Sequence, residues 1–146
     1  MEEKMVFDEP YVAHYQYSVG AVGTRFFTEL RDNKKILGMR CPACHLVYFP
    51  PRATCHRCLA KLDEWVELSD QGTLITYTVV HYSEPVQPQE PPFAYGLIRL
   101  DGADTCICHF LGEVDPESIN IGMRVKAVFR EKGEGNMLDI RYFKPL

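Results

Sequence analysis

Four cysteines stand as two closely spaced pairs within the stretch CPACHLVYFPPRATCHRC, residues 41–58. Cys41 and Cys44 form one C-x2-C pair, Cys55 and Cys58 form the second, and ten residues separate the pairs. Each pair can turn as a tight knuckle that directs two thiolates at one point, and two knuckles complete a tetrahedron around a metal ion. The spacing therefore predicts a zinc ribbon that holds one zinc ion, although iron uses the same four sulfurs in rubredoxin-like sites.

Four thiolates around one metal leave no open coordination position for water or substrate. Closed sites of this kind are structural, so we expect the zinc to stabilise the fold rather than to react. His45 and His56 lie next to the cysteines, and either could replace a ligand, but the four sulfurs complete the site without them. A thioredoxin-type redox pair would need a βαβ unit around one C-x2-C pair, and the sequence predicts none.

The two remaining cysteines, Cys106 and Cys108, are two residues apart in a predicted strand. They would share one face with Phe110, and the default interpretation is that they are buried core thiols. The alternative is a nucleophile near His109 or His81, but His109 would point to the opposite face. The sequence contains no nucleophile elbow, phosphate loop or dinucleotide-binding motif. The cysteines therefore favour metal binding over catalysis.

Before the cysteines, the chain predicts an aromatic arm and one helix. Residues 1–23 contain tyrosines and glycines without a regular period, so we expect an extended arm that packs on a partner or on its own domain. The segment TRFFTELRD, residues 24–32, predicts a short helix with Thr24 as its N-cap. Its apolar side chains predict one buried face, made of Phe26, Phe27 and Leu30.

After the cysteines, the chain predicts a small β-barrel. Residues 61–72 are interpreted as a connector that contains the single tryptophan, Trp65. Strand and turn signals then predict five strands, with a short helical turn at 115–119 between the third and the fourth. The strands are 73–82, 93–100, 105–111, 123–130 and 137–143, the last with Leu138, Ile140 and Tyr142 on one face. This order is typical of an OB-fold, a small Greek-key barrel.

Composition and charge narrow the classes of function. The 146 residues carry a net charge of −4, which disfavours a general nucleic-acid binder, and no apolar stretch is long enough to span a membrane. The N-terminus lacks the apolar region of a secretion signal, so we expect a cytoplasmic protein with reduced thiols. Between Thr24 and Lys61, eight Lys or Arg accompany two acidic residues, a local charge of +6 that leaves −10 for the rest. This basic segment predicts either solvated surface charge or a docking surface for an anionic ligand or partner.

Several blocks of the sequence resemble the zinc-ribbon and OB-fold proteins associated with acyl-CoA enzymes, a family formerly described as a domain of unknown function. These blocks, between residues 24 and 145, are RFFTELRDNKKILGMRCPAC, VYFPPRATCHRC, GTLITYTVVHY, PPFAYGLIRLDG and INIGMRVKAVF. Together with the hydrophobic pattern they predict a mainly β protein with three parts. We expect an N-terminal arm and short helix at 1–37, a rubredoxin-like zinc ribbon at 38–66 and a five-stranded OB-fold barrel at 67–146.

The resemblance also implies a function, that of a non-catalytic accessory subunit beside a thiolase, a hydroxymethylglutaryl-CoA synthase or an acyl-CoA hydratase. Of these we expect a hetero-oligomer with a thiolase-like catalytic subunit, an acyl-CoA C-acyltransferase whose catalytic residues lie on the partner chain. The lead-in YSVGAVGTRFFTELRDNKKI is similar to the small subunits of thiolases that act on benzoylsuccinyl-CoA in anaerobic toluene degradation. The alternative function is nucleic-acid binding through the groove of the OB-fold.

An acyl-CoA at the shared interface would present phosphates and an adenine ring. Arginine forks suit phosphate oxygens, and the basic segment supplies the candidates Arg52, Arg40, Arg57 and Lys35. Arg52 is the foremost of these, because the two prolines before it stiffen its approach and lower the entropy lost on binding. The adenine could stack on an aromatic side chain, with Tyr48, Phe49, Tyr77 and Phe93 as candidates.

Overall fold

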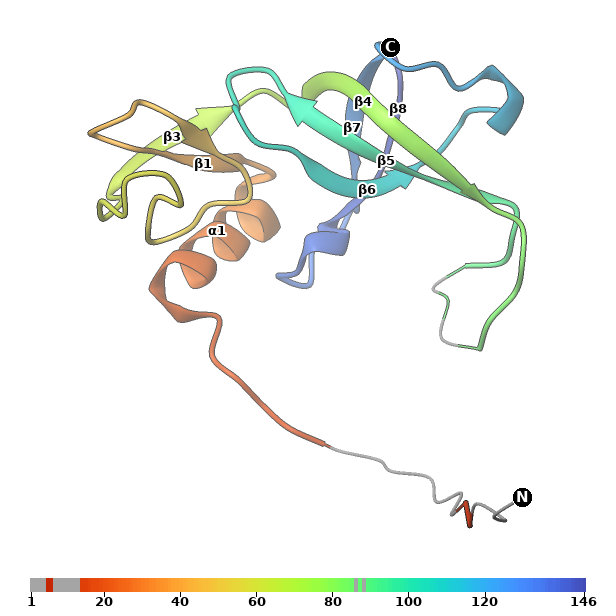
Figure 1. The fold of residues 1–146 in the computed structure, drawn as a ribbon, viewed down its shortest axis with the longest axis horizontal. Helices are drawn as coiled ribbons and strands as arrows, with labels where there is room; N and C mark the ends of the chain where they lie inside the picture. Colours follow the sequence, from red (N-terminus) through yellow and green to blue (C-terminus); the bar gives the residue numbers. More distant parts are fainter. Residues whose placement is uncertain (1–4, 7–13, 86, 88) are drawn as a thin grey trace.

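The computed structural model describes residues 5–6, 14–85, 87 and 89–146. A helix and a small three-stranded sheet lie beside a five-stranded barrel (Figure 1). In chain order the elements are α1 (Gly20–Asn33), β1 (Ile36–Arg40), β2 (Val47–Tyr48), β3 (Glu64–Leu68), β4 (Gln71–Val80), β5 (Phe93–Leu100), β6 (Ile107–Leu111), the 3-10 turn η1 (Pro116–Ser118), β7 (Arg124–Phe129), the 3-10 turn η2 (Met137–Asp139) and β8 (Ile140–Pro145). The predicted mainly β architecture with one helix near the N-terminus is confirmed.

Helix α1 begins at Gly20, four residues before the predicted start. The prediction of Thr24 as N-cap is wrong, because Thr24 lies inside the helix and its Oγ1 donates to the carbonyl oxygen of Gly20 at 2.7 Å. The hydroxyl oxygen of Ser18 instead accepts a hydrogen bond from the Gly20 amide at 3.1 Å. The predicted apolar face is confirmed, since Phe26 and Leu30 are buried and Phe27 packs against the core.

The predicted arm precedes this helix. Residues 14–19 have no regular secondary structure and lie on the surface, and the side chains of Tyr15 and Tyr17 are each 78% exposed. Residues 1–4 and 7–13 of the arm lie outside the described residues.

Residues 36–68, here called the ribbon, form a three-stranded antiparallel sheet in the order β2-β1-β3. The prediction of a connector over residues 61–72 is wrong where β3 pairs with β1, from Ile36 opposite Leu68 to Arg40 opposite Glu64. Strand β3 shows no clean alternation of burial, so its pairing with β1 defines it rather than a hydrophobic period. Because β1 and β3 reach Ile36 and Leu68, the boundaries proposed at 37/38 and 66/67 fall inside strands, and the division into domains stays a prediction.

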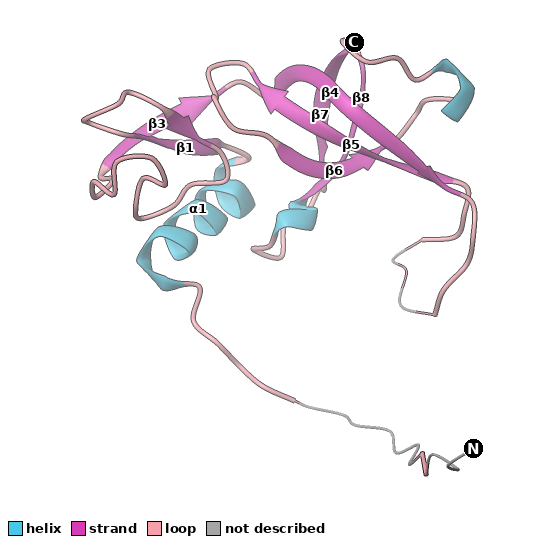
Figure 2. Ribbon diagram, viewed as in Figure 1, coloured by secondary structure: helices cyan, strands magenta, loops and turns pink. Residues whose placement is uncertain are grey.

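Strands β4 to β8 close into a barrel in the order β4-β5-β6-β8-β7, with β7 paired back to β4 (Figure 2). Strands β6 and β8 run parallel and pair at Leu111 and Phe143, while the other neighbours are antiparallel. The turn η1 lies between the third and fourth barrel strands, where Asp115 Oδ1 accepts a hydrogen bond from the Glu117 amide. The predicted OB-fold is confirmed.

The last barrel strand differs from its prediction. Residues 137–139 form η2, capped by the Asn136 side chain, and the pairing of β7 with β8 shifts register at Phe129. Ile140 and Phe143 are fully buried, whereas Leu138 is 40% exposed. The 3-10 turn removes Leu138 from the strand, so the two-residue period expected from 137 onward fails.

The buried apolar side chains form two clusters. The larger one joins helix, ribbon and barrel, and includes Phe26 from α1, Leu68 from β3 and Phe143 from β8. The smaller one lies beside the four paired cysteines and consists of Met39, Cys41, Tyr48, Cys55 and Leu62. Among the helices of the described residues, none has the length and apolar composition needed to cross a lipid bilayer.

Candidate metal centre

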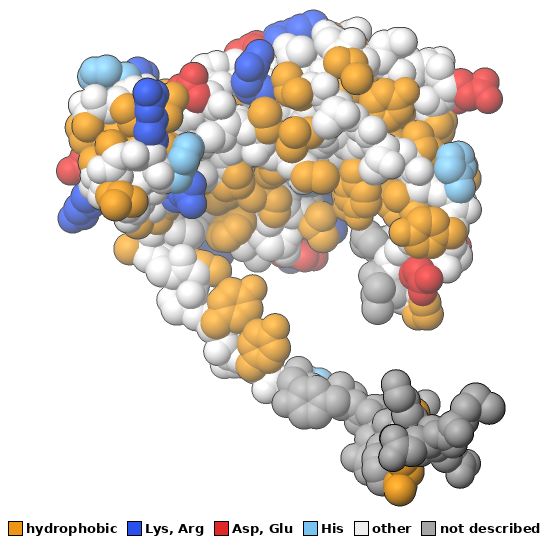
Figure 3. Space-filling model, viewed as in Figure 1, with side chains coloured by type: hydrophobic (Ala, Val, Ile, Leu, Met, Phe, Trp, Pro, Cys, Tyr) orange, Lys and Arg blue, Asp and Glu red, His pale blue; other side chains and the backbone are white. Residues whose placement is uncertain are grey.

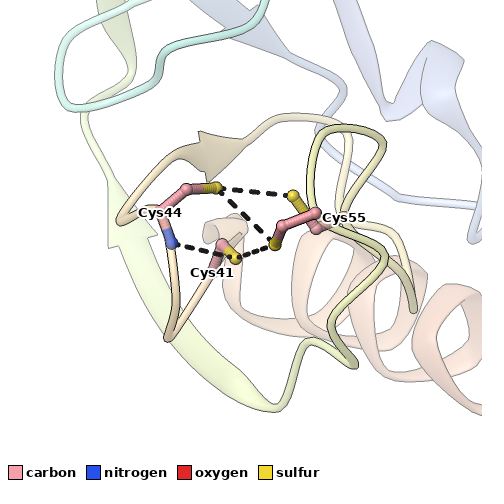
Figure 4. A group of neighbouring side chains, drawn as sticks. Cys41, Cys44 and Cys55 are labelled. Atoms are coloured by element: carbon pink, nitrogen blue, oxygen red, sulfur yellow. Dashed lines mark hydrogen bonds between the residues drawn. The ribbon is translucent and has the colours of Figure 1, made fainter.

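The two cysteine pairs lie in neighbouring loops of the ribbon, one after β1 and the other between β2 and β3. Figure 4 shows the sulfurs of Cys41, Cys44 and Cys55 turned toward one another. All four sulfurs lie within 4.8 Å of each other, with Cys41–Cys58 and Cys44–Cys55 at 3.5 Å and Cys44–Cys58 at 4.0 Å. A tetrahedral zinc ion with Zn–S bonds of about 2.3 Å requires sulfur–sulfur distances of about 3.8 Å. The four thiols are thus spaced to hold one zinc ion.

The two loops use the same local turn. In the first, the amide of Cys41 donates to the carbonyl of Leu46 at 2.8 Å, and in the second the amide of Cys55 donates to the carbonyl of Ala60 at 2.9 Å. In both, the residue after the second cysteine adopts a left-handed conformation with φ of 60°, at His45 and Leu59. The repeated C-x2-C spacing therefore folds into two matching knuckles.

The most buried sulfurs are held by hydrogen bonds. Cys41 and Cys55 are fully buried, and the Tyr48 hydroxyl lies 3.0 Å from Cys55 Sγ. Burial opposes ionisation of Cys55, but hydrogen bonds from Tyr48 and from the backbone of Cys58 and Arg57 outweigh it and lower its pKa to about 5. The thiolate is the form that binds a metal, so this sulfur is prepared to be a ligand.

The neighbouring thiol behaves in the opposite way. Burial, together with the hydrogen bonds shared with Cys41 and Cys55, raises the pKa of Cys44 to about 12. Negative charges on adjacent sulfurs repel each other, so several thiolates cannot share this site without a cation. A divalent cation would supply the compensating positive charge. Four sulfurs at these distances are therefore better suited to binding a metal ion than to remaining as four protonated thiols.

Neither histidine beside the cysteines belongs to the group of four potential ligands. The ring of His56 instead packs edge-on against the ring of Tyr48, with centroids 5.4 Å apart.

The residues that support this centre have no signature in the amino-acid sequence. Tyr48 reaches Cys55 through its hydroxyl, and β2, which carries it, is tied to the turn before β6. There, Asp104 Oδ2 accepts from the Val47 amide at 2.8 Å, and Thr105 Oγ1 accepts from the Phe49 amide at 2.7 Å. These partners are more than 50 residues apart in the chain, so no local spacing predicts them.

Two of the four basic residues proposed for CoA are paired with acids of β3. Lys35 pairs with Glu67 at 2.9 Å and Arg40 pairs with Glu64 at 3.1 Å, so acids of β3 neutralise part of the basic segment. Arg57 is exposed in the second knuckle.

Arg52 lies over the ring of Tyr48, with its guanidinium carbon 5.5 Å from the ring centroid. With Lys61 it lines a groove of about 500 Å³ beside the first turn of α1, residues 19–23. Of the four candidates, Arg52 is the one placed in this groove.

The aromatic candidates for adenine stacking are structural. Tyr48, Phe49 and Phe93 are buried, and Tyr77 is partly buried against the main core. None of the four offers an open ring face comparable to that of an exposed aromatic residue.

Strand β6 buries the face opposite to the one predicted. Ile107, His109 and Leu111 are buried, whereas Cys108 is exposed. His109 Nδ1 accepts from the Phe110 amide at 2.9 Å, so Nε2 carries the proton and faces the Met137 carbonyl at 3.3 Å. Burial lowers the pKa of His109, which keeps the ring neutral with both nitrogens occupied. His109 therefore does not serve as a base for Cys108.

Two family models match the chain. The rubredoxin-like zinc ribbon domain of ChsH2 matches residues 28–63, and the C-terminal OB-fold domain of ChsH2 matches residues 65–130. These ranges contain the four cysteines and the first four barrel strands.

Individual relatives agree with these matches. A DUF35 domain-containing scaffold protein of Methanocaldococcus jannaschii is 33% identical over 127 residues, which cover 84% of this chain and 89% of the relative. A probable enoyl-CoA hydratase alpha subunit of Thermomonospora curvata is 29% identical over 101 residues, 68% of this chain and 31% of that protein. A solved structure described as an Ltp2-ChsH2(DUF35) aldolase superposes with a TM-score of 0.66 and 25% identity, over 89% of this chain and 98% of the matched chain. The chain belongs to the DUF35 family, which combines a rubredoxin-like zinc ribbon with an OB-fold.

Proposed function

We propose that this chain is a non-catalytic, zinc-binding accessory subunit of a thiolase-type acyl-CoA C-acyltransferase complex. The observation that carries the proposal is the similarity of almost the whole chain to a protein within an Ltp2-ChsH2(DUF35) aldolase. The descriptions of two further relatives, a scaffold protein and a probable enoyl-CoA hydratase subunit, support a place beside an enzyme of acyl-CoA metabolism.

The chemistry of the described residues favours a structural role over a catalytic one. Cys41, Cys44, Cys55 and Cys58 are proposed as the ligands of one structural zinc, and four sulfurs leave that ion no position for substrate. The exposed thiol of Cys108 has no free base in His109. The reaction would then belong to the partner, whose cysteine nucleophile would take the acyl group before thiolysis by free CoA.

The surface offers a place for such a partner. The side chains of Tyr15 and Tyr17 are exposed, and their ring centroids are 6.1 Å apart. Figure 3 shows hydrophobic side chains on the described part of the arm, clear of the body of the molecule. Tyrosine is enriched at protein interfaces, because it buries a large ring and still keeps a hydrogen-bonding hydroxyl. We propose that the described part of the arm, which carries these two rings, packs against the catalytic subunit.

We place the phosphates of CoA at the groove that Arg52 lines. Lys61 adds a second positive charge there. The N-cap residue of α1, Val19, has no side chain that accepts hydrogen bonds from the backbone amides of the first turn. Basic side chains beside a helix N-terminus favour phosphate groups.

Arg40 and Arg57 lie in the ribbon and Lys35 lies one residue before it. We propose Arg57 as the one that adds positive charge unpaired within the described residues toward the ligand. Arg40 and Lys35 would reach the ligand by leaving their acidic partners, Glu64 and Glu67.

The identity of the partner rests on the sequence resemblance. We propose a thiolase that acts on benzoylsuccinyl-CoA in anaerobic toluene degradation, and a cytoplasmic location that suits reduced thiols. Aldolase or enoyl-CoA hydratase partners are the other outcomes that the relatives' descriptions suggest.

The test is coexpression with the candidate thiolase, followed by purification through a tag on this chain and metal analysis of the complex. We expect a hetero-oligomer with one zinc per copy, no thiolysis of benzoylsuccinyl-CoA by this chain alone, and activity only when both proteins are present. An unchanged activity of the thiolase without this chain would refute the accessory role. Copurification with an aldolase or hydratase would replace the thiolase.

The CoA site has its own control. In the complex, Arg52→Ala should raise the KM for CoA by about tenfold or more, because a charge-assisted hydrogen bond is worth about 1.5–3 kcal/mol. Arg99→Ala, an exposed arginine of β5, should leave the KM unchanged. Equal effects of both substitutions would remove Arg52 from the CoA site.

A further inference from the structure

We propose that the outer face of the barrel binds a planar aromatic ring that carries a carboxylate or phosphate group. Two hollows adjoin on this face, and they share Phe110 and Leu138 as a common wall. One hollow is apolar and aromatic, and the other contains two arginines. This site shares no lining residue with the Arg52 groove, and its test requires no partner subunit.

The apolar hollow has a volume of about 290 Å³. Its lining is formed by Tyr95, Cys108, His109, Phe110, Met137 and Leu138. Tyr95 and Phe110 are partly exposed and stack with centroids 4.6 Å apart at 28°, while Phe93, on the same face of β5 as Tyr95, packs edge-on against it. A partly exposed pair of stacked rings is a platform on which a third aromatic ring can lie.

The second hollow has a volume of about 350 Å³ and is lined by Arg130 and Arg141, together with Gln89 and Tyr142. Arg130 pairs with Glu134 at 3.1 Å, and Arg141 lies over the ring of Tyr142 at 5.5 Å. Each guanidinium has five N–H donors, so these contacts leave donors for an incoming anion. Because Phe110 borders both hollows, one small ligand can reach the rings and the arginines together.

Buried polar groups hold this face in shape. The carboxylate of Asp139, 2% exposed, accepts the amides of Glu134 and Gly135 at 2.8 Å each and so fixes the loop after β7. The ring of His109 fixes η2 through the Met137 carbonyl. A site formed before the ligand arrives loses less entropy on binding.

The position in the fold points to the same conclusion. OB-folds bind ligands on the face of their second and third strands, between the loop that joins the first two strands and the loop that joins the last two. Here these parts are β5, β6, the segment that contains Gln89, and the segment from Arg130 to η2. Figure 3 shows hydrophobic side chains gathered on the underside of the barrel in this view.

The charges favour a small ligand over a nucleic-acid polymer. A single strand requires a continuous basic track, and its binding is dominated by many phosphate contacts. This face offers two arginines, one of which, Arg130, is paired with Glu134. The whole chain has a net charge of −4. One ring and one anionic group match what is present. Such a ligand could be the nucleotide end of a cofactor or an aryl carboxylate.

The test is calorimetric titration of the full, zinc-loaded chain without a partner. The probes are adenosine 5′-monophosphate and phenylsuccinate, which carry a ring and an anion, and the controls are adenosine, succinate and a deoxythymidine oligonucleotide. We expect saturable binding of at least one ring-bearing anion, and binding about tenfold or more weaker for adenosine and succinate, because one charged hydrogen bond or one stacking contact is worth about 1–3 kcal/mol. Preference for one probe identifies the source of the ring.

Variants then locate the site. Arg141→Ala changes an exposed side chain and should weaken binding about tenfold, and Tyr95→Ala should do the same if the chain keeps its melting temperature. Arg99→Ala, on the same strand as Tyr95, is the matched control and should have no effect. Absence of binding by both ring-bearing anions, binding that ignores Arg141→Ala, or binding of the oligonucleotide alone would overturn the proposal. None of these results would affect the accessory function, whose test requires the partner.

Discussion

The tip of the ribbon and the barrel differ in how much buried apolar surface each contains. The barrel encloses large side chains with no exposed surface, among them Leu74, Ile98 and Phe143. The tip, residues 41–62, contributes four of the five buried residues of a separate cluster, and two of these four are Cys41 and Cys55. The barrel can therefore be held by apolar burial, whereas the tip lacks enough apolar surface to offset the entropy of ordering its loops.

The two regions are nevertheless joined. The base of the ribbon contributes Ile36 and Leu68 to the main core, and Asp104 and Thr105 bond β2 to the barrel side. The boundary of metal dependence is thus expected inside the ribbon, at the ends of the two knuckles, rather than between ribbon and barrel. Four changes test this contrast, beginning with the largest effect.

Removal of a sulfur should separate the two regions most clearly. Cys55→Ser replaces a fully buried thiol whose pKa is lowered to about 5, and structural zinc contributes on the order of 10 kcal/mol to small metal-dependent folds. We expect loss of stoichiometric zinc and loss of protection at the knuckle amides of Cys41, His45 and Leu59. Protection at the barrel amides of Leu74 and Ile98 should be retained. Elemental analysis and hydrogen exchange measure these outcomes.

Cys106→Ser is the matched control, because Cys106 lies outside the cluster of four sulfurs. It should leave zinc content and amide protection unchanged. If Cys55→Ser melted the barrel together with the tip, the proposed boundary inside the ribbon would be wrong.

A cavity in the barrel should give the reverse pattern. Phe143→Ala removes a fully buried ring from β8 and should lower the free energy of unfolding by about 3–5 kcal/mol. Zinc content at neutral pH should stay at one ion per chain, because the apolar cluster beside the cysteines contains no residue of β8. Denaturant unfolding and zinc analysis on the same samples provide the measurement, and zinc loss in the folded variant would contradict it.

Loss of one hydroxyl should weaken the metal centre without dismantling it. Tyr48→Phe keeps the buried ring but removes the contact to Cys55 Sγ at 3.0 Å, and loss of a group that supports a ligand costs about 10–100-fold in metal affinity. Competition with a chelator measures the zinc affinity. Tyr77→Phe, in β4, removes a hydroxyl from the barrel and should leave that affinity unchanged; equal affinities of both variants would assign Tyr48 a packing role alone.

The same contrast explains what could be predicted from the sequence. The knuckles follow from cysteine spacing alone, since each turn closes within six residues, and the four sulfurs meet as expected. The order of the barrel strands follows from turn residues and apolar runs, which also act locally.

The failures share a dependence on contacts distant in the chain. Strand β3 exists because β1 lies beside it, and Tyr48 reaches Cys55 because Asp104 and Thr105 fix β2. In β6, the face of Cys108 and Phe110 carries no strongly polar residue, whereas the opposite face carries His109. The period alone therefore favours the wrong face. His109 lies inside because two backbone groups satisfy its ring nitrogens, and neither contact has a signature in sequence.

The smallest expected effect concerns acid, to which the two regions should respond through different groups. Burial lowers the pKa of His109 below that of an exposed histidine, so the unfolded chain binds a proton that the folded chain does not. The stability that the neutral ring contributes is therefore complete above about pH 6.5 and is lost as the pH falls through the lower folded-state pKa. His109→Gln should flatten the decline in protection of the barrel amides of Leu74 and Ile98 between pH 7.5 and 5.5, whereas exposed His14→Gln should not. At the tip, the decline should instead follow zinc release as thiolates bind protons, and it should be the same in both variants. An unchanged slope at the barrel amides in His109→Gln would show that acid reaches the barrel only through the metal centre, and the two regions would then not be independent.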